Sequence, residues 1–152
     1  MTKQRFKITP AAYLIIIKDK KILMSKRFNT GYEDGNYSLV AGHLDGGGTF
    51  RQAITREAKE ETDLDIDPAK TKVVHIMHRY EKNNNPEIRE RIDVFIQTNE
   101  YFGVSKIMEP DKCGNLSWFN LDDLPRNTIP YIKHAIECIL NNITYSEFGF
   151  DD

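Results

Sequence analysis

Three glutamates in one predicted helix are the residues of this chain best suited to chemistry. The stretch FRQAITREAKEET predicts a helix over residues 50–62, because apolar side chains recur on one face at about 100° per residue. The core-facing residues are Phe50, Ala53, Ile54 and Ala58, and those expected to face water are Gln52, Thr55, Lys59 and Thr62. Glu57 and Glu61 project into the apolar arc, and Glu60 lies at its edge. Carboxylates in these positions are costly unless something compensates their charge.

Two kinds of partner could compensate these glutamates. Arg56 could pair with one of them, but a single arginine cannot neutralise three. The i, i+3, i+4 spacing of Glu57, Glu60 and Glu61 gathers the carboxylates on one side of about one helical turn. Such a group suits oxygen-ligand metals such as Mg²⁺ or Mn²⁺. The residues alone leave a metal site and a partly exposed helix edge as open alternatives.

The stretch GHLDGGGTFRQAITREAKEETDL, residues 42–64, resembles the Nudix box, G-x5-E-x7-R-E-U-x-E-E-x-G-U, where U is a bulky aliphatic residue. The positions that match in register are Gly42, Arg56, Glu57, Glu60, Glu61 and Leu64, with Ala58 as a small aliphatic residue. Two positions depart from the pattern: Gly48 replaces a glutamate and Asp63 replaces a glycine. The second departure is mild, because aspartate tolerates the left-handed backbone of a helix C-terminus better than most residues.

The resemblance implies an α/β fold of the α+β kind, in which a mixed β-sheet is sandwiched between helices. It also implies metal-dependent hydrolysis, with Mg²⁺ or Mn²⁺, of the diphosphate linkage in a nucleoside diphosphate joined to another group. The substrate would then be a nucleoside triphosphate, a nucleotide sugar or a dinucleoside polyphosphate. By the same resemblance, Glu57 and Glu61 are the principal metal ligands and Glu60 is a further ligand or helper. A backbone carbonyl at Ala41 or Gly42 completes the shell.

The roles of the remaining candidates are less determined. By the resemblance, Arg56 orients the carboxylates through charge-assisted hydrogen bonds. The general base is Glu57 or an acid of a later loop, Glu109 or Asp111, for which a plain polar loop is the alternative. Arg27, at a strand end, is a candidate phosphate contact or a solvated surface arginine. Tyr80 lies near the place where some dinucleoside polyphosphate hydrolases carry a tyrosine, although tyrosine is common in strands.

Gly48 creates a second functional hypothesis. With glycine at a carboxylate position, Arg56 has one acidic partner fewer and the site has one negative charge fewer. The leading hypothesis is an active hydrolase whose activity is reduced. The alternative is a catalytically weakened domain that binds a nucleotide as a sensor or interaction module.

The elements that position these residues follow from the periodicity of the chain. Residues 11–27 predict a hairpin that turns around residues 18–20, and residues 37–42 predict a short strand. Thr49 and Gln52 have the spacing of a capping box at the start of the helix. The later elements are strands over residues 72–81, 89–101 and 115–120, a last helix over residues 129–141 and a tail without clear periodicity.

The composition predicts a single globular domain over residues 1–152. A formal net charge of −2 shows no basic excess, which argues against nucleic acid as a partner. The longest apolar stretch, AAYLIII, is too short to cross a bilayer, the start lacks the apolar run of a signal peptide, and Cys113 and Cys138 form no disulfide framework. We therefore expect a cytoplasmic protein with a small nucleotide diphosphate as substrate and no membrane partner. The aromatic tail, residues 143–152, could cover the domain or a second copy in a homodimer.

Overall fold

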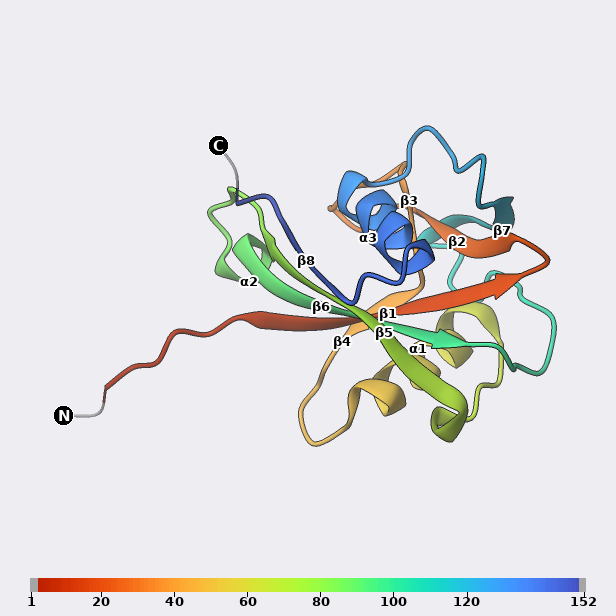
Figure 1. The fold of residues 1–152 in the computed structure, drawn as a ribbon, viewed down its shortest axis with the longest axis horizontal. Helices are drawn as coiled ribbons and strands as arrows, with labels where there is room; N and C mark the ends of the chain where they lie inside the picture. The colour runs from red at the N-terminus through yellow and green to blue at the C-terminus, as the bar shows by residue number, and fades with distance from the viewer. Residues whose placement is uncertain (1–2, 151–152) are drawn as a thin grey trace.

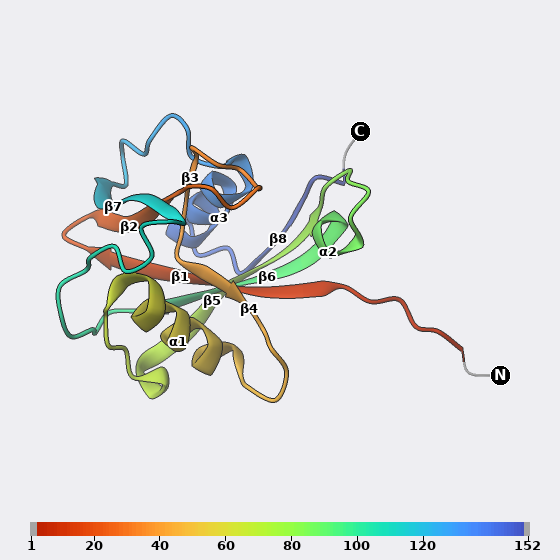
Figure 2. The same ribbon diagram turned by 180° about the vertical axis from the view of Figure 1, so that it is seen from behind.

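The computed structural model describes residues 3–150, which form a mixed eight-stranded sheet with helices on both faces (Figures 1 and 2). The strands are β1 (Thr9–Lys18), β2 (Lys21–Arg27), β3 (Tyr37–Ser38), β4 (Ala41–His43), β5 (Thr71–Tyr80), β6 (Glu90–Thr98), β7 (Cys113–Asn120) and β8 (Tyr145–Phe148). The helices are α1 (Phe50–Thr62), α2 (Pro86–Arg89) and α3 (Pro130–Leu140), with a 3₁₀ turn, η1, at Pro68–Lys70. The strand order is β3-β2-β1-β6-β5-β8, while β4 pairs with β1 and β7 pairs with β2.

Strand β1 lies at the centre of the sheet and changes partners along its length. Residues 11–13 pair with β4 in antiparallel orientation, and residues 9–16 pair with β6 in parallel orientation. Pairing with β2 is limited to residues 17 and 18, next to the hairpin turn. β2 then pairs with β3 and β7, so β2 and β4 leave β1 in different directions.

Two apolar clusters pack on the two faces of this sheet. Because side chains alternate along a strand, β1 sends Tyr13 and Ile15 into the cluster beneath α3, and Leu14 and Ile16 into the cluster beneath α1. Figures 1 and 2 show α1 and α3 on opposite sides of the sheet. The predicted α+β architecture, a mixed sheet between helices, is thereby confirmed.

Helix α1 begins and ends where the sequence predicts. Thr49 accepts a hydrogen bond from the backbone N–H of Gln52, and the Gln52 side chain accepts one from the N–H of Thr49, so the capping box is confirmed. Asp63 ends the helix in the left-handed conformation, with φ of 64°. One expectation was wrong: Thr62 does not face water but is fully buried, and its hydroxyl donates to the carbonyl of Ala58.

Two segments differ from the predicted strands. In place of the single strand predicted over residues 37–42, the chain forms β3 and β4, which pair with β2 and β1 respectively. The tail contains strand β8, which extends the sheet in parallel beside β5. After β8, Phe150 packs against His78 and Tyr80, with ring centroids 4.6 and 5.6 Å apart. The described part of the tail therefore covers the domain itself. Within residues 3–150, none of the helices has the length and apolar character needed to span a membrane.

Candidate active site

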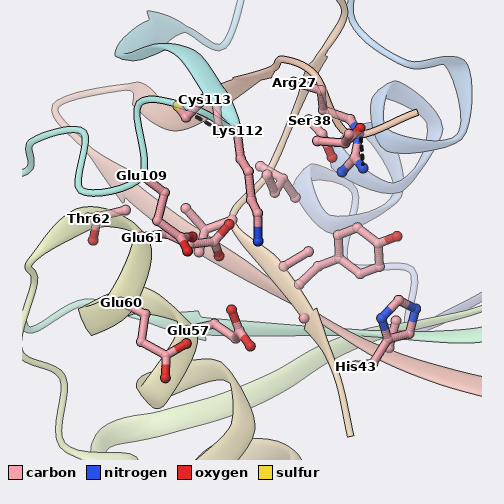
Figure 3. Close-up of a pocket in the computed structure, with 18 of the residues that line it drawn as sticks. Arg27, Ser38, His43, Glu57, Glu60, Glu61, Thr62, Glu109, Lys112 and Cys113 are labelled. Atoms are coloured by element: carbon pink, nitrogen blue, oxygen red, sulfur yellow. Dashed lines mark hydrogen bonds between the residues drawn. The ribbon is translucent and has the colours of Figure 1, made fainter. Parts of the chain in front are cut away.

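A cleft of about 440 Å³ opens where β2 and β4 separate, and its opposite wall is α1 (Figure 3). Helix α1 contributes Glu57, Glu60 and Glu61, and the segment before β7 contributes Glu109 and Lys112. The rest of the lining includes Arg27 from β2, Ala41, Gly42 and His43 from β4, and Arg91 from β6. The predicted carboxylates thus share one cavity with several cationic side chains.

Glu61 is the most strongly perturbed acid of the cleft. Its Oε2 atom is buried without a hydrogen-bond partner in the described structure. Burial, followed by the charges of Glu57 and Glu109, raises the pKa of this carboxyl to about 8, while a backbone hydrogen bond from Ala41 and the charge of Arg27 act in the opposite direction. An added cation would reverse this destabilisation of the carboxylate, so the donor set fits a hard metal ion.

Glu57 lies against β4 because residue 42 is a glycine. A Cβ atom at Gly42 would collide with the Cγ and the carboxyl group of Glu57. Burial, followed by the charge of Glu60, raises the pKa of Glu57, and Arg56 opposes the shift. Gly42 therefore permits the close approach of strand and helix that places this carboxylate in the cleft.

The backbone of β4 offers a further oxygen. The carbonyl of Val40 accepts a hydrogen bond from the N–H of Leu14, so Val40 directs its backbone groups toward β1. Because consecutive residues of an antiparallel strand direct these groups to opposite sides, Ala41 directs its N–H and carbonyl away from β1, and Gly42 directs them toward it. Of the two predicted carbonyl ligands, Ala41 is thus the one whose carbonyl points away from β1.

Arg56 has an acidic partner that the box pattern does not contain. Its guanidinium lies 2.6 Å from Oδ2 of Asp45 and 3.4 Å from Oε1 of Glu57. The hydrogen bond that Arg56 donates to Asp45 is the main reason why the pKa of Arg56 is raised. At Gly48, an added Cβ would meet only Gln52 Oε1, at 3.5 Å, so a side chain has room there. Sequence reasoning missed Asp45, although its place in the loop before the helix was a signal.

The loop before β7 is attached to the end of α1. The N–H of Lys106 donates to the carbonyl of Thr62, and the N–H of Met108 donates to that of Glu61. The carbonyl of Glu109 accepts from the N–H of Lys112, whose own carbonyl accepts from Phe28. These backbone bonds hold Glu109 and Lys112 beside the helical glutamates.

Lys112 was not predicted as a site residue. Figure 3 shows its ammonium group directed into the cleft, and no ion pair within residues 3–150 includes it. Its position beside the candidate base Glu109 was the available signal in the sequence. Asp111, the other acid of this loop, does not line the cleft.

Arg27 is held in the cleft, whereas Tyr80 lies elsewhere. The guanidinium of Arg27 donates to the carbonyl of Tyr32 at 2.6 Å and to the hydroxyl of Thr30 at 3.1 Å. The loop that supplies both acceptors is closed by Asp34, which accepts from Thr30 and Gly31. Tyr80 is not among the residues that line the cleft, and it packs against the tail.

The carboxylates converge without forming a closed ligand set. Within residues 3–150, no group of three His, Cys, Asp or Glu residues has the spacing needed to hold a metal ion. The arrangement is an open acidic wall with one buried, unpartnered oxygen. It can bind a cation whose coordination is completed by other oxygens, such as those of water or a phosphate.

Comparison with known proteins agrees with this geometry. A family model described as the NUDIX domain matches residues 7–137. The NAD-capped RNA hydrolase NudC of Escherichia coli O157:H7 is 28% identical over 119 residues, which cover 78% of this chain and 41% of that protein. The chain spans about two fifths of the length of the first curated relatives it matches.

Two solved structures share the fold. The MutT NUDIX hydrolase of Burkholderia pseudomallei superimposes with a TM-score of 0.78 at 23% identity, over 87% of this chain and 98% of that one. A bifunctional NMN adenylyltransferase/ADP ribose pyrophosphatase of Francisella tularensis, complexed with AMP and a manganese ion, gives a TM-score of 0.67 at 17% identity, over 90% and 42% of the two chains. The family match covers most of the chain and includes every residue that lines the cleft, so this protein belongs to the NUDIX family.

Proposed function

We propose that this protein hydrolyses the diphosphate linkage of a nucleoside diphosphate joined to another group, with Mg²⁺ or Mn²⁺ as its cofactor. The names of its relatives support the proposal: one is a hydrolase of NAD-capped RNA, and a protein of the same fold was solved with AMP and manganese. The observation that carries it is the buried, unpartnered oxygen of Glu61 in an acidic cleft that also contains cationic side chains.

The acidic wall would hold the metal. Glu57 and Glu61 would supply carboxylate ligands, the Ala41 carbonyl a backbone ligand, and Glu60, at the edge of the cleft, a further oxygen. A bound divalent ion would neutralise phosphate oxygens and lower the pKa of the attacking water. Arg56, held by Asp45, would orient Glu57 through the contact between the guanidinium and the Glu57 carboxylate.

The cationic side chains of the cleft would bind the substrate. Arg27 and Lys112 would donate hydrogen bonds to phosphate oxygens, because both cations line the cleft. Glu109 and Glu57 are the acids that could accept a proton from the attacking water, and the two lie close enough for the charge of Glu109 to affect the pKa of Glu57. Either carboxylate would act as the general base across the space that the substrate fills.

The test is release of phosphate or pyrophosphate from a nucleotide panel in the presence of Mg²⁺ or Mn²⁺. Glu61→Gln should reduce turnover roughly a hundredfold or more, since several kcal/mol of transition-state stabilisation depend on the metal. It should also abolish the rise in Tm that the metal causes in the parent protein. Glu100→Gln, an exposed acid outside the cleft, should behave like the parent. Absence of metal-dependent turnover on every diphosphate compound would refute the proposal.

A nucleotide sensor with weak turnover is the second candidate, and Gly48 is the observation that favours it. If Gly48→Glu raised activity by orders of magnitude while nucleotide affinity stayed the same, this candidate would be preferred. The pairing of Arg56 with Asp45 favours the active enzyme, because the arginine keeps an acidic partner.

A further inference from the structure

Arg91 is a buried cation without an anion. It lies on β6 with only 8% of its surface exposed, and its Nε atom has no hydrogen-bond partner in the described structure. Within residues 3–150, its one side-chain hydrogen bond joins a terminal nitrogen to Nε2 of His43. No carboxylate within residues 3–150 forms an ion pair with it.

The neighbouring buried arginine, Arg79, is paired with a carboxylate. Arg79 lies opposite Arg91 on the adjacent strand β5, and its Nε donates to Asp93 at 2.7 Å. Its guanidinium also lies 3.7 Å from the ring centroid of Tyr131. The carboxylate of Asp93 is thereby engaged by Arg79. An uncompensated buried charge destabilises the folded protein, and a bound anion would offset this cost at Arg91.

His43 adds a hydrogen-bond donor at the same place. An arginine guanidinium can only donate, so Nε2 of His43 is the acceptor in this hydrogen bond. Because Nε2 accepts from Arg91, a neutral ring carries its proton on Nδ1. No acceptor for Nδ1 is found within the described residues. The Arg91–His43 pair therefore presents hydrogen-bond donors to the cleft.

Two buried tyrosines complete this end of the cleft. The hydroxyls of Tyr13 and Tyr131 lie 3.1 Å apart, so one donates to the other and one proton is left over. Burial raises the pKa of Tyr13 to about 12, which keeps its hydroxyl protonated. Both tyrosines, His43 and Arg91 line the same cavity as the glutamates. In Figure 3, the side chains of Glu57 and His43 lie on opposite sides of strand β4.

We propose that the Arg91–His43 end of the cleft is an oxyanion subsite, which binds a phosphate group of the substrate other than the diphosphate that is cleaved. The inference rests on the proposed function and narrows it: the preferred substrate carries an additional phosphate, either on the ribose or in the phosphate chain. Arg91, the Nδ1–H of His43 and a tyrosine hydroxyl would donate to its oxygens.

Matched nucleotide pairs test the subsite by equilibrium binding. Each pair differs by one phosphate: AMP against the 2′,5′-bisphosphate, AMP against the 3′,5′-bisphosphate, and ADP against ATP, with the corresponding adenosine, guanosine and uridine compounds. Calorimetric titrations are done in EDTA, so that neither metal binding nor hydrolysis affects the result. In at least one pair, the parent should bind the compound with the extra phosphate about tenfold more tightly or better, since charge-assisted hydrogen bonds to a buried cation are strong. Comparison of the pairs that differ on the ribose with the pair that differs in the phosphate chain shows which phosphate position the subsite binds.

Four variants test whether Arg91 and His43 cause the preference. Arg91→Met should abolish it while changing the affinity for the compound without the extra phosphate less than about twofold. Arg91→Lys should keep part of it, and Arg89→Met, an exposed arginine on α2 outside the cleft, should keep it in full. If Arg91→Met does not fold, His43→Ala removes an exposed donor and should weaken the preference instead.

Equal affinities within every pair for the parent, or a preference that survives both Arg91→Met and His43→Ala, would overturn the inference. The result is separable from the proposed function. A protein that hydrolyses diphosphates without this preference refutes the subsite alone. A protein that shows the Arg91-dependent preference and no hydrolysis refutes the activity alone.

Discussion

At the scale of single residues, the ion pair between Asp45 and Arg56 changes how Gly48 is understood. The pattern predicts that glycine at 48 deprives Arg56 of an acidic partner, yet Asp45 lies 2.6 Å from its guanidinium. A residue that orients a ligand typically affects activity about tenfold or more. By our interpretation, Asp45 therefore supplies the acidic partner of Arg56 that the missing glutamate would have provided.

This interpretation makes a prediction for a double-mutant cycle. Asp45→Ala should reduce kcat/KM about tenfold, because Arg56 loses the contact that orients it toward Glu57. Gly48→Glu should change the parent little but restore most of the activity of Asp45→Ala, since position 48 has room for a side chain. The measurement is kcat/KM for the four proteins, together with the Tm of each.

Asp122→Ala serves as the control, since it removes an exposed acid from a turn outside the cleft. Additive effects of the two substitutions would contradict the interpretation, because they would show that residues 45 and 48 act independently.

At the scale of elements, the site depends on how closely β4 approaches α1. Gly42→Ala should displace the Glu57 carboxylate, because the new Cβ would occupy the space of its Cγ and carboxyl group. We expect kcat to fall about tenfold and the metal-induced rise in Tm to shrink. Turnover assays measure the first quantity, and thermal melts with and without Mg²⁺ measure the second.

A glycine of another strand provides the matched control. At Gly114 on β7, an added Cβ would meet Phe28 Cβ at 3.6 Å, an ordinary contact, so Gly114→Ala should leave both quantities unchanged. If Gly42→Ala had no effect on the response to metal, Glu57 would not be a ligand held by this contact.

The elements themselves were predictable where their signals are local. Helix α1 has a capping box at its start and an aspartate that tolerates the left-handed conformation at its end, and both boundaries were predicted correctly. Thr62 was assigned to the wrong environment because a helical wheel contains no information on the loop that covers the helix end. Strand β8 was not recognised because it has only four residues, and its parallel pairing with β5 depends on tertiary contacts.

The same distinction applies to the site. The three glutamates were found because one helical turn brings them together. Arg91 and His43 are 48 residues apart and meet only through the order of β4, β1 and β6. A weak signal was present in the sequence, since Arg91 and Asp93 occupy alternate positions of β6 and so share one face of a strand whose centre is apolar.

At the scale of the whole molecule, the cleft results from the division of partners along β1. β4 pairs with the first half of β1, whereas β2 pairs with its end and with β7. The cleft between them is lined by the glutamates of α1 and by Arg27 of β2, so its acidic and cationic side chains come from different parts of the chain. The homodimer and the single-domain organisation stay predictions.

The C-terminal segment is joined to this framework through His75, which makes stability depend on pH. His75 is fully buried, with Nδ1 2.7 Å from the carbonyl of Ile143 and Nε2 2.7 Å from the hydroxyl of Ser146. A carbonyl can only accept, so Nδ1 carries a proton, and Ser146 donates to Nε2 of the neutral ring. Burial lowers the pKa of His75, and the bond to Ile143 opposes the shift in part.

We therefore expect His75 to contribute stability that is lost on acidification. Above the unfolded-state pKa of about 6.5, the ring is neutral in both states and the contribution is complete. As pH falls below that value, the unfolded chain binds a proton that the folded chain resists, so the free energy of unfolding decreases. His75→Asn, whose amide can still donate to Ile143, should be less stable than the parent at pH 7.5 and should lose less stability between pH 7 and 5. Urea unfolding of both proteins across this range measures the difference and cancels the carboxylates they share. An NMR titration in which the His75 ring of the folded protein protonates above pH 6.5 would contradict the assignment.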